Sequence, residues 1–169
     1  MSIPQKIQKF LEKNKTKYEP TEHRTVYTAY DKAATLKVPE KTIGKTLIMK
    51  IDPIGKPSAS YGASKNYVLV LIPANKNLDK VKLRKTARAK SVDFAKEAWA
   101  KKNLKGVKVG AVPPFGNLWK LPTFIDRSLI NQPKIIINGG DYNWSIKINP
   151  TVLKKIIPDL IISSLSKTR

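Results

Sequence analysis

The chain carries hydrophobic and polar residues in two periods, one typical of helices and one typical of strands. In residues 2–16 the apolar positions recur three or four residues apart, which predicts an amphipathic helix with its lysines facing the solvent. Further helices are expected at residues 29–36, 77–90, 95–104 and 151–157. Strands are expected in the middle of residues 22–28 and at 45–51, 67–72, 121–125, 134–138 and 144–148. This mixture, without a repeat or a boundary, predicts a single α+β domain over residues 1–169.

The predicted strand at 67–72 is apolar at every position, so we expect it to be buried on both faces at the centre of a sheet. Gly139, Gly140 and Asp141 have the composition of a tight turn. They are expected to join the last two predicted strands as a hairpin.

Lys45 heads one of the predicted strands and raises the first question about function. Period-two alternation places it on the same face as Leu47, Met49 and Ile51, which is otherwise apolar. A lysine in such a row either reaches the solvent at the rim of the core or points into a pocket, and the pattern alone favours the rim. The order Gly44-Lys45-Thr46 is not the end of a phosphate-binding loop, because Pro39 stands where that motif needs glycine.

Composition excludes several kinds of chemistry. The 169 residues include no cysteine and one histidine, which excludes disulfides, thiolate metal sites and multi-histidine zinc sites. We therefore predict neither a metal nor a cofactor. The sequence shows no signal peptide and no apolar run of membrane-spanning length, so a soluble cytoplasmic protein is expected.

The formal net charge of +21 indicates a polyanionic partner, most simply a nucleic acid. A role in solubility alone is the simpler alternative. Aromatic residues are too few and scattered to predict a base-stacking platform, so contacts to backbone phosphates are expected. Two consecutive predicted helices carry the candidate phosphate ligands. These are Lys80, Lys82, Arg84, Lys85, Arg88, Lys101 and Lys102.

Residues 110–116 place two prolines between Gly110 and Gly116. Such a stiff turn can present fixed backbone N–H groups to a ligand, although an ordinary tight turn has the same composition.

Taken in order, these segments resemble the YbaK/prolyl-tRNA synthetase editing-domain family. The resemblance extends from about residue 18 to residue 157 and depends on the joint order of motifs that are individually unspecific. The segments are Glu22-His23 with Thr28, then Gly44-Lys45-Thr46-Leu47, residues 110–116, residues 124–129, and Asn138-Gly139-Gly140.

The resemblance implies a mixed, mostly antiparallel β-barrel-like sheet surrounded by helices. It also implies a freestanding deacylase that acts in trans on mischarged tRNA. Lys45 matches the family's functional lysine, and Gly110 and Pro114 match a loop whose backbone is implied to bind the aminoacyl group. The other implied substrate-binding residues are His23, Thr28, Thr46, Asn138, Gly139 and Gly140.

The implied reaction suits the composition. The ester between an amino acid and the terminal adenosine is already activated, so hydrolysis needs positioning, a water or ribose hydroxyl, and donors for the oxyanion. Alanine, serine, threonine and cysteine all remain open as the amino acid removed, and tRNA-Pro as its carrier. The acceptor end of tRNA is the expected partner, with an aminoacyl-tRNA synthetase as a second candidate, and a monomer or weak dimer is expected.

Two other functions stay open at this point. One is a non-enzymatic RNA-binding protein on the same fold. The other is a small-ester or amide hydrolase with a serine–lysine pair, for which Ser58, Ser60 or Ser64 would be the nucleophile.

Overall fold

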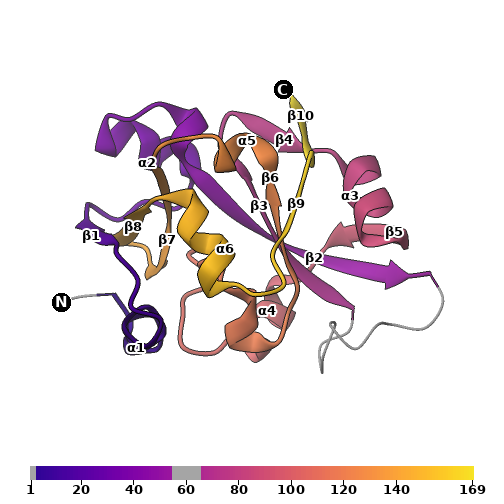
Figure 1. The fold of residues 1–169 in the computed structure, drawn as a ribbon, viewed down its shortest axis with the longest axis horizontal. Coiled ribbons are helices and arrows are strands. Elements are labelled where there is room, and N and C mark those ends of the chain that lie inside the picture. The colour runs from indigo at the N-terminus through magenta and orange to yellow at the C-terminus, as the bar shows by residue number, and fades with distance from the viewer. Residues whose placement is uncertain (1–2, 55–65) are drawn as a thin grey trace.

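Helices pack around three sheets of a mixed α+β fold (Figure 1). The structure is a computed structural model that describes residues 3–54 and 66–169. Its α-helices are α1 Gln5–Lys13, α2 Ala29–Leu36, α3 Lys80–Ala87, α4 Glu97–Asn103, α5 Arg127–Ile130 and α6 Leu153–Ile156. Single 3-10 turns lie at Glu40–Thr42, Gly116–Trp119 and Pro150–Val152. The strands are β1 Glu19–Glu22, β2 Gly44–Pro53, β3 Tyr67–Pro73, β4 Lys76–Leu78, β5 Ala89–Phe94, β6 Thr123–Asp126, β7 Ile135–Asp141, β8 Trp144–Ile148, β9 Ile161–Ser163 and β10 Ser166–Thr168.

The largest sheet has five strands in the order β5-β2-β3-β6-β9. β3 lies near its centre, between β2 and β6, and its residues 68–72 are completely buried, which confirms the prediction from their uninterrupted apolar run. The other sheets have the orders β1-β8-β7 and β10-β4. Of the seven strand pairs in the described part of the chain, five are antiparallel and two, β3 with β6 and β6 with β9, are parallel.

The two larger sheets meet at one point. Just before β2, Ile43 forms a parallel bridge with Ile136 of β7, and both residues are buried. Next to this bridge an opening remains between the start of β2 and the second half of β7, and the candidate site lies in it.

The core is divided between the two sides of the large sheet. One apolar cluster joins α1, α5 and α6 to β7 and β8, with Phe10 and Phe115 in ring contact at a centroid distance of 4.9 Å. A second cluster lies between α3 and the faces of β2, β3 and β5, and includes Met49 and Ile51 from the face that Lys45 heads. The alternation predicted for this strand is therefore confirmed.

Asp126 explains part of the motif at residues 124–129. Its buried carboxylate caps α5 by accepting hydrogen bonds from Ser128, and it accepts a further one from the Leu165 N–H at 2.7 Å. Burial alone would raise the pKa of this carboxyl, but the hydrogen bonds from Ser128, Leu165 and Ser166 together hold the pKa below its ordinary value. Asp126 thus ties the end of β6 to the segment between β9 and β10.

Several expectations need correction. The first strand, β1, ends at Glu22, so the residues that follow His23 are not the strand predicted there. The helix predicted at 77–90 is the shorter α3, because its two ends belong to β4 and β5, where pairing with β10 and β2 prevails over helical propensity. β9 and β10 were not predicted at all.

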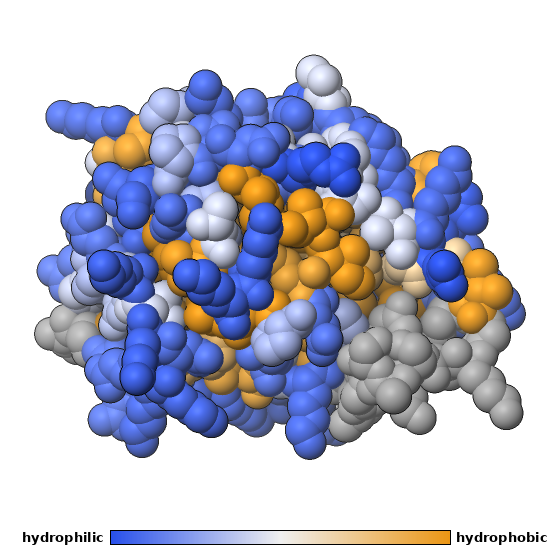
Figure 2. All heavy atoms as spheres, viewed as in Figure 1, coloured by the Kyte–Doolittle hydropathy of each residue, from blue (hydrophilic) through white to orange (hydrophobic). Residues whose placement is uncertain are grey.

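The expected barrel is unconfirmed, since the described strands form three open sheets. Across residues 3–54 and 66–169, no helix is both long and apolar enough to cross a membrane. Figure 2 shows a mainly hydrophilic face with a hydrophobic area near its centre, where α6 and β9 lie in Figure 1. The serines proposed as alternative nucleophiles, Ser58, Ser60 and Ser64, lie outside the described residues.

Candidate active site

A cavity of about 190 Å³ occupies the opening between the two larger sheets. Four segments form its walls, namely the start of β2, the N-terminal part of α2 with the residues before it, the loop around Gly110, and the second half of β7. Its lining residues are Val26, Tyr27, Thr28, Ala29, Lys32, Ile43, Gly44, Lys45, Thr46, Gly110, Ala111, Asn138, Asp141 and Tyr142. Five of the sequence-predicted site residues meet here, and these are Thr28, Lys45, Thr46, Gly110 and Asn138.

Lys45 enters the cavity from β2 and is half-buried. Both positions considered for Lys45 apply, because it heads the apolar row at the rim of the core and also lines a pocket. Burial, reinforced by the positive charge of Arg169, lowers the pKa of its ammonium group, and Glu40 opposes this shift. Arg169 is held nearby by Glu40 at 3.8 Å and by the Ala74 carbonyl at 2.6 Å.

Lys32 enters from α2 and is a second lysine in the same cavity, which the sequence interpretation missed. Its side chain is buried, with 7% of the residue exposed, and its Nζ donates to Oδ1 of Asn138 at 2.7 Å. Burial lowers the pKa of Lys32 to about 8. Asn138 in turn donates from Nδ2 to the Val112 carbonyl at 3.1 Å, so a polar chain joins α2, β7 and the loop after Gly110.

The signal for Lys32 was present in the helix itself. In α2 the inward-facing positions are Ala29, Lys32, Ala33 and Leu36, which have the i, i+3, i+4, i+7 spacing of a buried stripe. A lysine inside such a stripe must be paired or face a cavity, because its charge is costly to bury.

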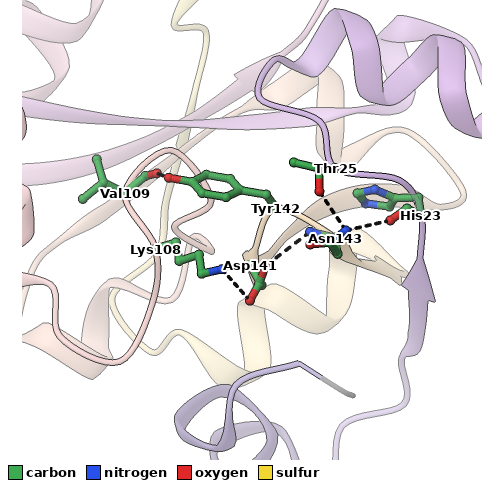
Figure 3. Close-up of polar contacts among 7 residues, drawn as sticks. All are labelled: His23, Thr25, Lys108, Val109, Asp141, Tyr142 and Asn143. Carbon is green, nitrogen blue, oxygen red and sulfur yellow. Dashed lines mark hydrogen bonds and ion pairs between the residues drawn. The ribbon is translucent and has the colours of Figure 1, made fainter.

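The loop at residues 108–111 is held in place by the β7–β8 turn (Figure 3). The Tyr142 hydroxyl donates to the Val109 carbonyl, and Lys108 pairs with Asp141 at 3.3 Å. Two backbone hydrogen bonds of 2.9 Å also join the loop to β7. The Lys108 N–H donates to the Gly140 carbonyl, and the Gly140 N–H donates to the Ala111 carbonyl. We call this set of contacts between residues 108–111 and 140–142 the clamp. On the other side of the turn, Asn143 donates to Thr25 at 2.9 Å.

Gly110 lies within this clamp at a φ of +88°, which glycine adopts without strain. Its N–H group has no hydrogen-bond partner among the described residues. A rigid loop that leaves one N–H group unpaired beside a cavity can stabilise negative charge on a ligand oxygen.

Thr46 contributes a second unpaired group. Its Oγ1 is buried and has no hydrogen-bond partner within the described part of the chain. Thr28 differs, because its Oγ1 already accepts a hydrogen bond from the Asp31 N–H at 3.0 Å and so caps α2.

Comparison with models of known protein families identifies the family of this chain. A model of the aminoacyl-tRNA editing domain matches residues 23–156. The chain belongs to this family. The matched range contains all four walls of the cavity.

Solved structures with the same fold have diverged far in sequence from this editing domain. The hypothetical protein APE2540 has a TM-score of 0.80 at 22% identity, covering 96% of this chain and 100% of that one. A candidate trans-editing enzyme for prolyl-tRNA synthetase has a TM-score of 0.75 at 21% identity, covering 96% and 95%. A scaffold protein from epitope grafting has a TM-score of 0.77 at 22% identity, covering 97% and 96%. At these identities the likeness shows the fold alone.

The glycine pair of the editing domain lies within β7, and the hairpin turn expected at these residues lies further on, at residues 142–143. The register of β7 with β8 shifts between Asn138 and Asp141, and Gly140 has a φ of +97°. Strict alternation would place Asn138 and Asp141 on opposite faces. The irregular step at the glycines lets both border the cavity, as β-bulges commonly do near functional sites.

Four predicted site residues of the editing domain do not line the cavity. Gly139 packs against the Trp144 backbone, where a Cβ would come within 2.9 Å of the carbonyl oxygen, and a Cβ on Gly140 would meet Pro4 at 3.0 Å. Pro114 is buried in its loop. His23 is held outside the cavity by Ser145, at 2.9 Å from its Nε2, and burial lowers the pKa of its imidazole.

The predicted phosphate ligands of the editing domain divide between two helices. Lys80, Lys82, Arg84 and Lys85 lie on α3 with Arg88 at its C-cap, whereas Lys101 and Lys102 lie in the last turn of α4. One of them approaches the cavity, since Lys80 and Lys45 line the same neighbouring groove.

Proposed function

We propose that this editing domain is a trans-acting hydrolase that removes a small non-cognate amino acid from mischarged tRNA. The observation that carries the proposal is the meeting of Lys45, the unpaired N–H of Gly110 and the carboxylate of Asp141 in one small cavity. Alanine, serine, threonine and cysteine are the candidate amino acids, and tRNA-Pro is a candidate carrier. The net charge of +21 supports a polyanionic substrate.

Hydrolysis replaces the ester oxygen of the ribose with water. Water attacks the carbonyl carbon, the C–O bond to the ribose breaks, and the ribose oxygen takes a proton, giving a free amino acid and a free tRNA hydroxyl. Negative charge builds up on the carbonyl oxygen in the transition state. In our proposal the Gly110 N–H donates to this oxygen, and the Lys45 ammonium stabilises it or the adjacent phosphate in a site where water screens little.

Asp141 is suited to bind the α-ammonium group that every aminoacyl ester carries. It is the one carboxylate among the described residues that line the cavity. Its oxygens already accept from Lys108 at 3.3 Å and from the Asn143 N–H at 3.4 Å, and these long contacts leave lone pairs available. The sequence predicts only a turn at Asp141 and no part in substrate binding.

The volume of the cavity sets the class of amino acid. At about 190 Å³ it is smaller than the ~300–1,000 Å³ typical of sites that enclose a drug-sized ligand. A site of this size accepts a small side chain and excludes a large one by contact, which is how a second sieve corrects a synthetase pocket that discriminates one methylene by only about 1–3 kcal/mol.

Turnover on a panel of tRNAs mischarged with alanine, serine, threonine or cysteine tests the proposal. We expect hydrolysis of at least one member and a loss of about 10²- to 10³-fold in rate for Lys45→Ala, the size expected when one electrostatic stabiliser is removed. Lys50→Ala is the matched control, because Lys50 lies on the same strand but does not line the cavity. Its rate should equal that of the wild type.

Two results would contradict the proposal. Absence of hydrolysis across the panel would leave RNA binding without catalysis, and full activity of Lys45→Ala would remove Lys45 from the mechanism.

A further inference from the structure

At about 190 Å³ the cavity is smaller than the ~300–1,000 Å³ of sites that enclose a drug-sized ligand, so it does not enclose the several nucleotides at the end of an RNA. The cavity has room for a small aminoacyl group. The bases at the end of the RNA must therefore lie outside the cavity, on the surface around its mouth.

Two grooves continue from the cavity onto that surface. The first, of about 320 Å³, shares Lys45 with the cavity. The second, of about 240 Å³, shares Thr46 and Gly110 with it. Both grooves are lined by Phe94, so this side chain stands between the two ways out of the cavity.

Phe94 is exposed, with 56% of the residue accessible to solvent. Phe94 ends β5 and pairs with Met49 of β2. Its side chain is therefore on the same face of the sheet as Lys45, Leu47 and Met49. The Nζ of Lys80 lies 5.2 Å from the centroid of its ring, and Asp93 holds the same lysine at 4.0 Å. An exposed aromatic ring with a cation fixed beside it is the combination that single-strand-binding surfaces use to stack a base.

The charge around Phe94 fits an RNA strand. The first groove contains Lys45, Lys80 and Lys167 and no carboxylate among its described lining residues. Lys167 also lines a third groove with Lys76, Lys82 and Arg127, which continues the basic path away from the cavity. Phosphates that follow the terminal nucleotide can thus pass from one lysine to the next.

We propose that Phe94 and the lysines of this groove, Lys45, Lys80 and Lys167, form a stacking platform for the single-stranded end of the tRNA. The ring of Phe94 stacks on one of the terminal bases, and the lysines contact the adjoining phosphates. This inference rests on the proposed function and adds to it the path of the RNA. Such a platform was not predictable from the sequence, because the aromatic residues are scattered along the chain.

Binding of a short single-stranded RNA that ends in cytidine-cytidine-adenosine tests the platform without requiring catalysis. For Phe94→Ala we expect affinity to fall about 5- to 150-fold, the equivalent of one lost base stack. Phe94→Trp should retain the wild-type affinity. Val81→Ala is the matched control, since Val81 is exposed to 52% on α3 and lines none of these grooves. Lys80→Ala should reduce the slope of log affinity against log salt by about 0.7.

Three outcomes would overturn the platform. These are no binding by the wild-type protein, wild-type affinity in Phe94→Ala, or loss of affinity in Tyr27→Ala alone, which would move the base to the segment before α2. The platform and the proposed function can fail separately. RNA binding that requires Phe94, without any hydrolysis, would contradict the proposed function alone. Hydrolysis with unchanged RNA affinity and KM in Phe94→Ala would contradict the platform alone.

Discussion

Lys45 and Lys32 line one cavity from different elements, β2 and α2, and their surroundings differ. Lys45 lies on a strand and is half-buried, and two charged groups act on its ammonium, Arg169 by repulsion and Glu40 by attraction. Lys32 lies inside a helical stripe, is almost fully buried, and is bound to the amide of Asn138. Burial lowers the pKa of both groups, but only for Lys32 does it bring the pKa to about 8.

This difference separates a group that can act on a ligand from one that organises the wall behind it. The Lys45 ammonium makes no hydrogen bond or ion pair with the described residues, so it is available to a substrate. Lys32 and Asn138 instead connect α2, β7 and the loop that holds Gly110. We therefore expect substitution of Lys45 to affect the rate of hydrolysis, and substitution of Lys32 or Asn138 to affect the stability of the fold.

The largest expected effect on stability comes from Asn138→Ala. This change leaves the buried Lys32 ammonium without its acceptor and the Val112 carbonyl without its donor, at a cost of about 3 kcal/mol. Lys45→Ala should change the free energy of unfolding by no more than about 0.5 kcal/mol. Chemical denaturation of both variants measures the contrast.

Asn117→Ala is the control for the size of the Asn138 effect. Its side chain donates one neutral hydrogen bond to the Ile156 carbonyl at 3.1 Å, worth about 1 kcal/mol. Equal losses of stability in Asn138→Ala and Asn117→Ala would show that the hydrogen bond between Lys32 and Asn138 stabilises the fold no more than an ordinary one.

Alkaline pH should reveal the buried ammonium of Lys32. Its folded pKa of about 8 lies below the ordinary 10.5, so the unfolded chain binds more protons between these values and stability rises with pH. The gain should reach about 2 kcal/mol between pH 7 and pH 10 when the wild type is compared with Lys32→Met. Groups that titrate in both proteins, Lys45 among them, cancel in this difference. Parallel stability curves for the two proteins would refute a buried ionised Lys32.

The strand that carries Lys45 was predictable because its alternation is local. The uninterrupted apolar run at residues 67–72 likewise predicted a central strand. Lys32 was missed because a lysine on a short helix is usually solvated, and only the packing of α2 against Ile43 and Ile136 makes that face internal. Its place in the stripe with Ala29 and Leu36 was the one local sign.

Long-range pairing accounts for the other misses. β10 forms only because it pairs with β4, and the Asp126 carboxylate fixes the segment before it from 39 positions away. Asp141 faces the cavity because of an irregular register in β7, which composition does not encode. The proposed platform at Phe94 depends on one groove that is lined by residues far apart in the chain, from Lys45 to Lys167.

Thr46 provides the finest test of the comparison, because it lines the same cavity as Lys45 and its buried hydroxyl has no partner among the described residues. Thr46→Val keeps the shape and removes a buried unpaired hydroxyl, so we expect stability to rise by about 1 kcal/mol. Thr123→Val is the matched control with the opposite sign, since the Thr123 hydroxyl accepts from the buried Gly116 N–H at 3.0 Å. There the same substitution should destabilise by about 1 kcal/mol.

A gain in stability at Thr46 should be accompanied by a lower rate of deacylation if the hydroxyl is kept for the substrate, as groups at functional sites commonly trade stability for activity. Thermal denaturation and single-turnover hydrolysis of the best panel substrate measure the two effects together. Destabilisation of Thr46→Val equal to that of Thr123→Val would mean that the Thr46 hydroxyl is satisfied within the fold. The β2 wall would then present Lys45 alone to the ester.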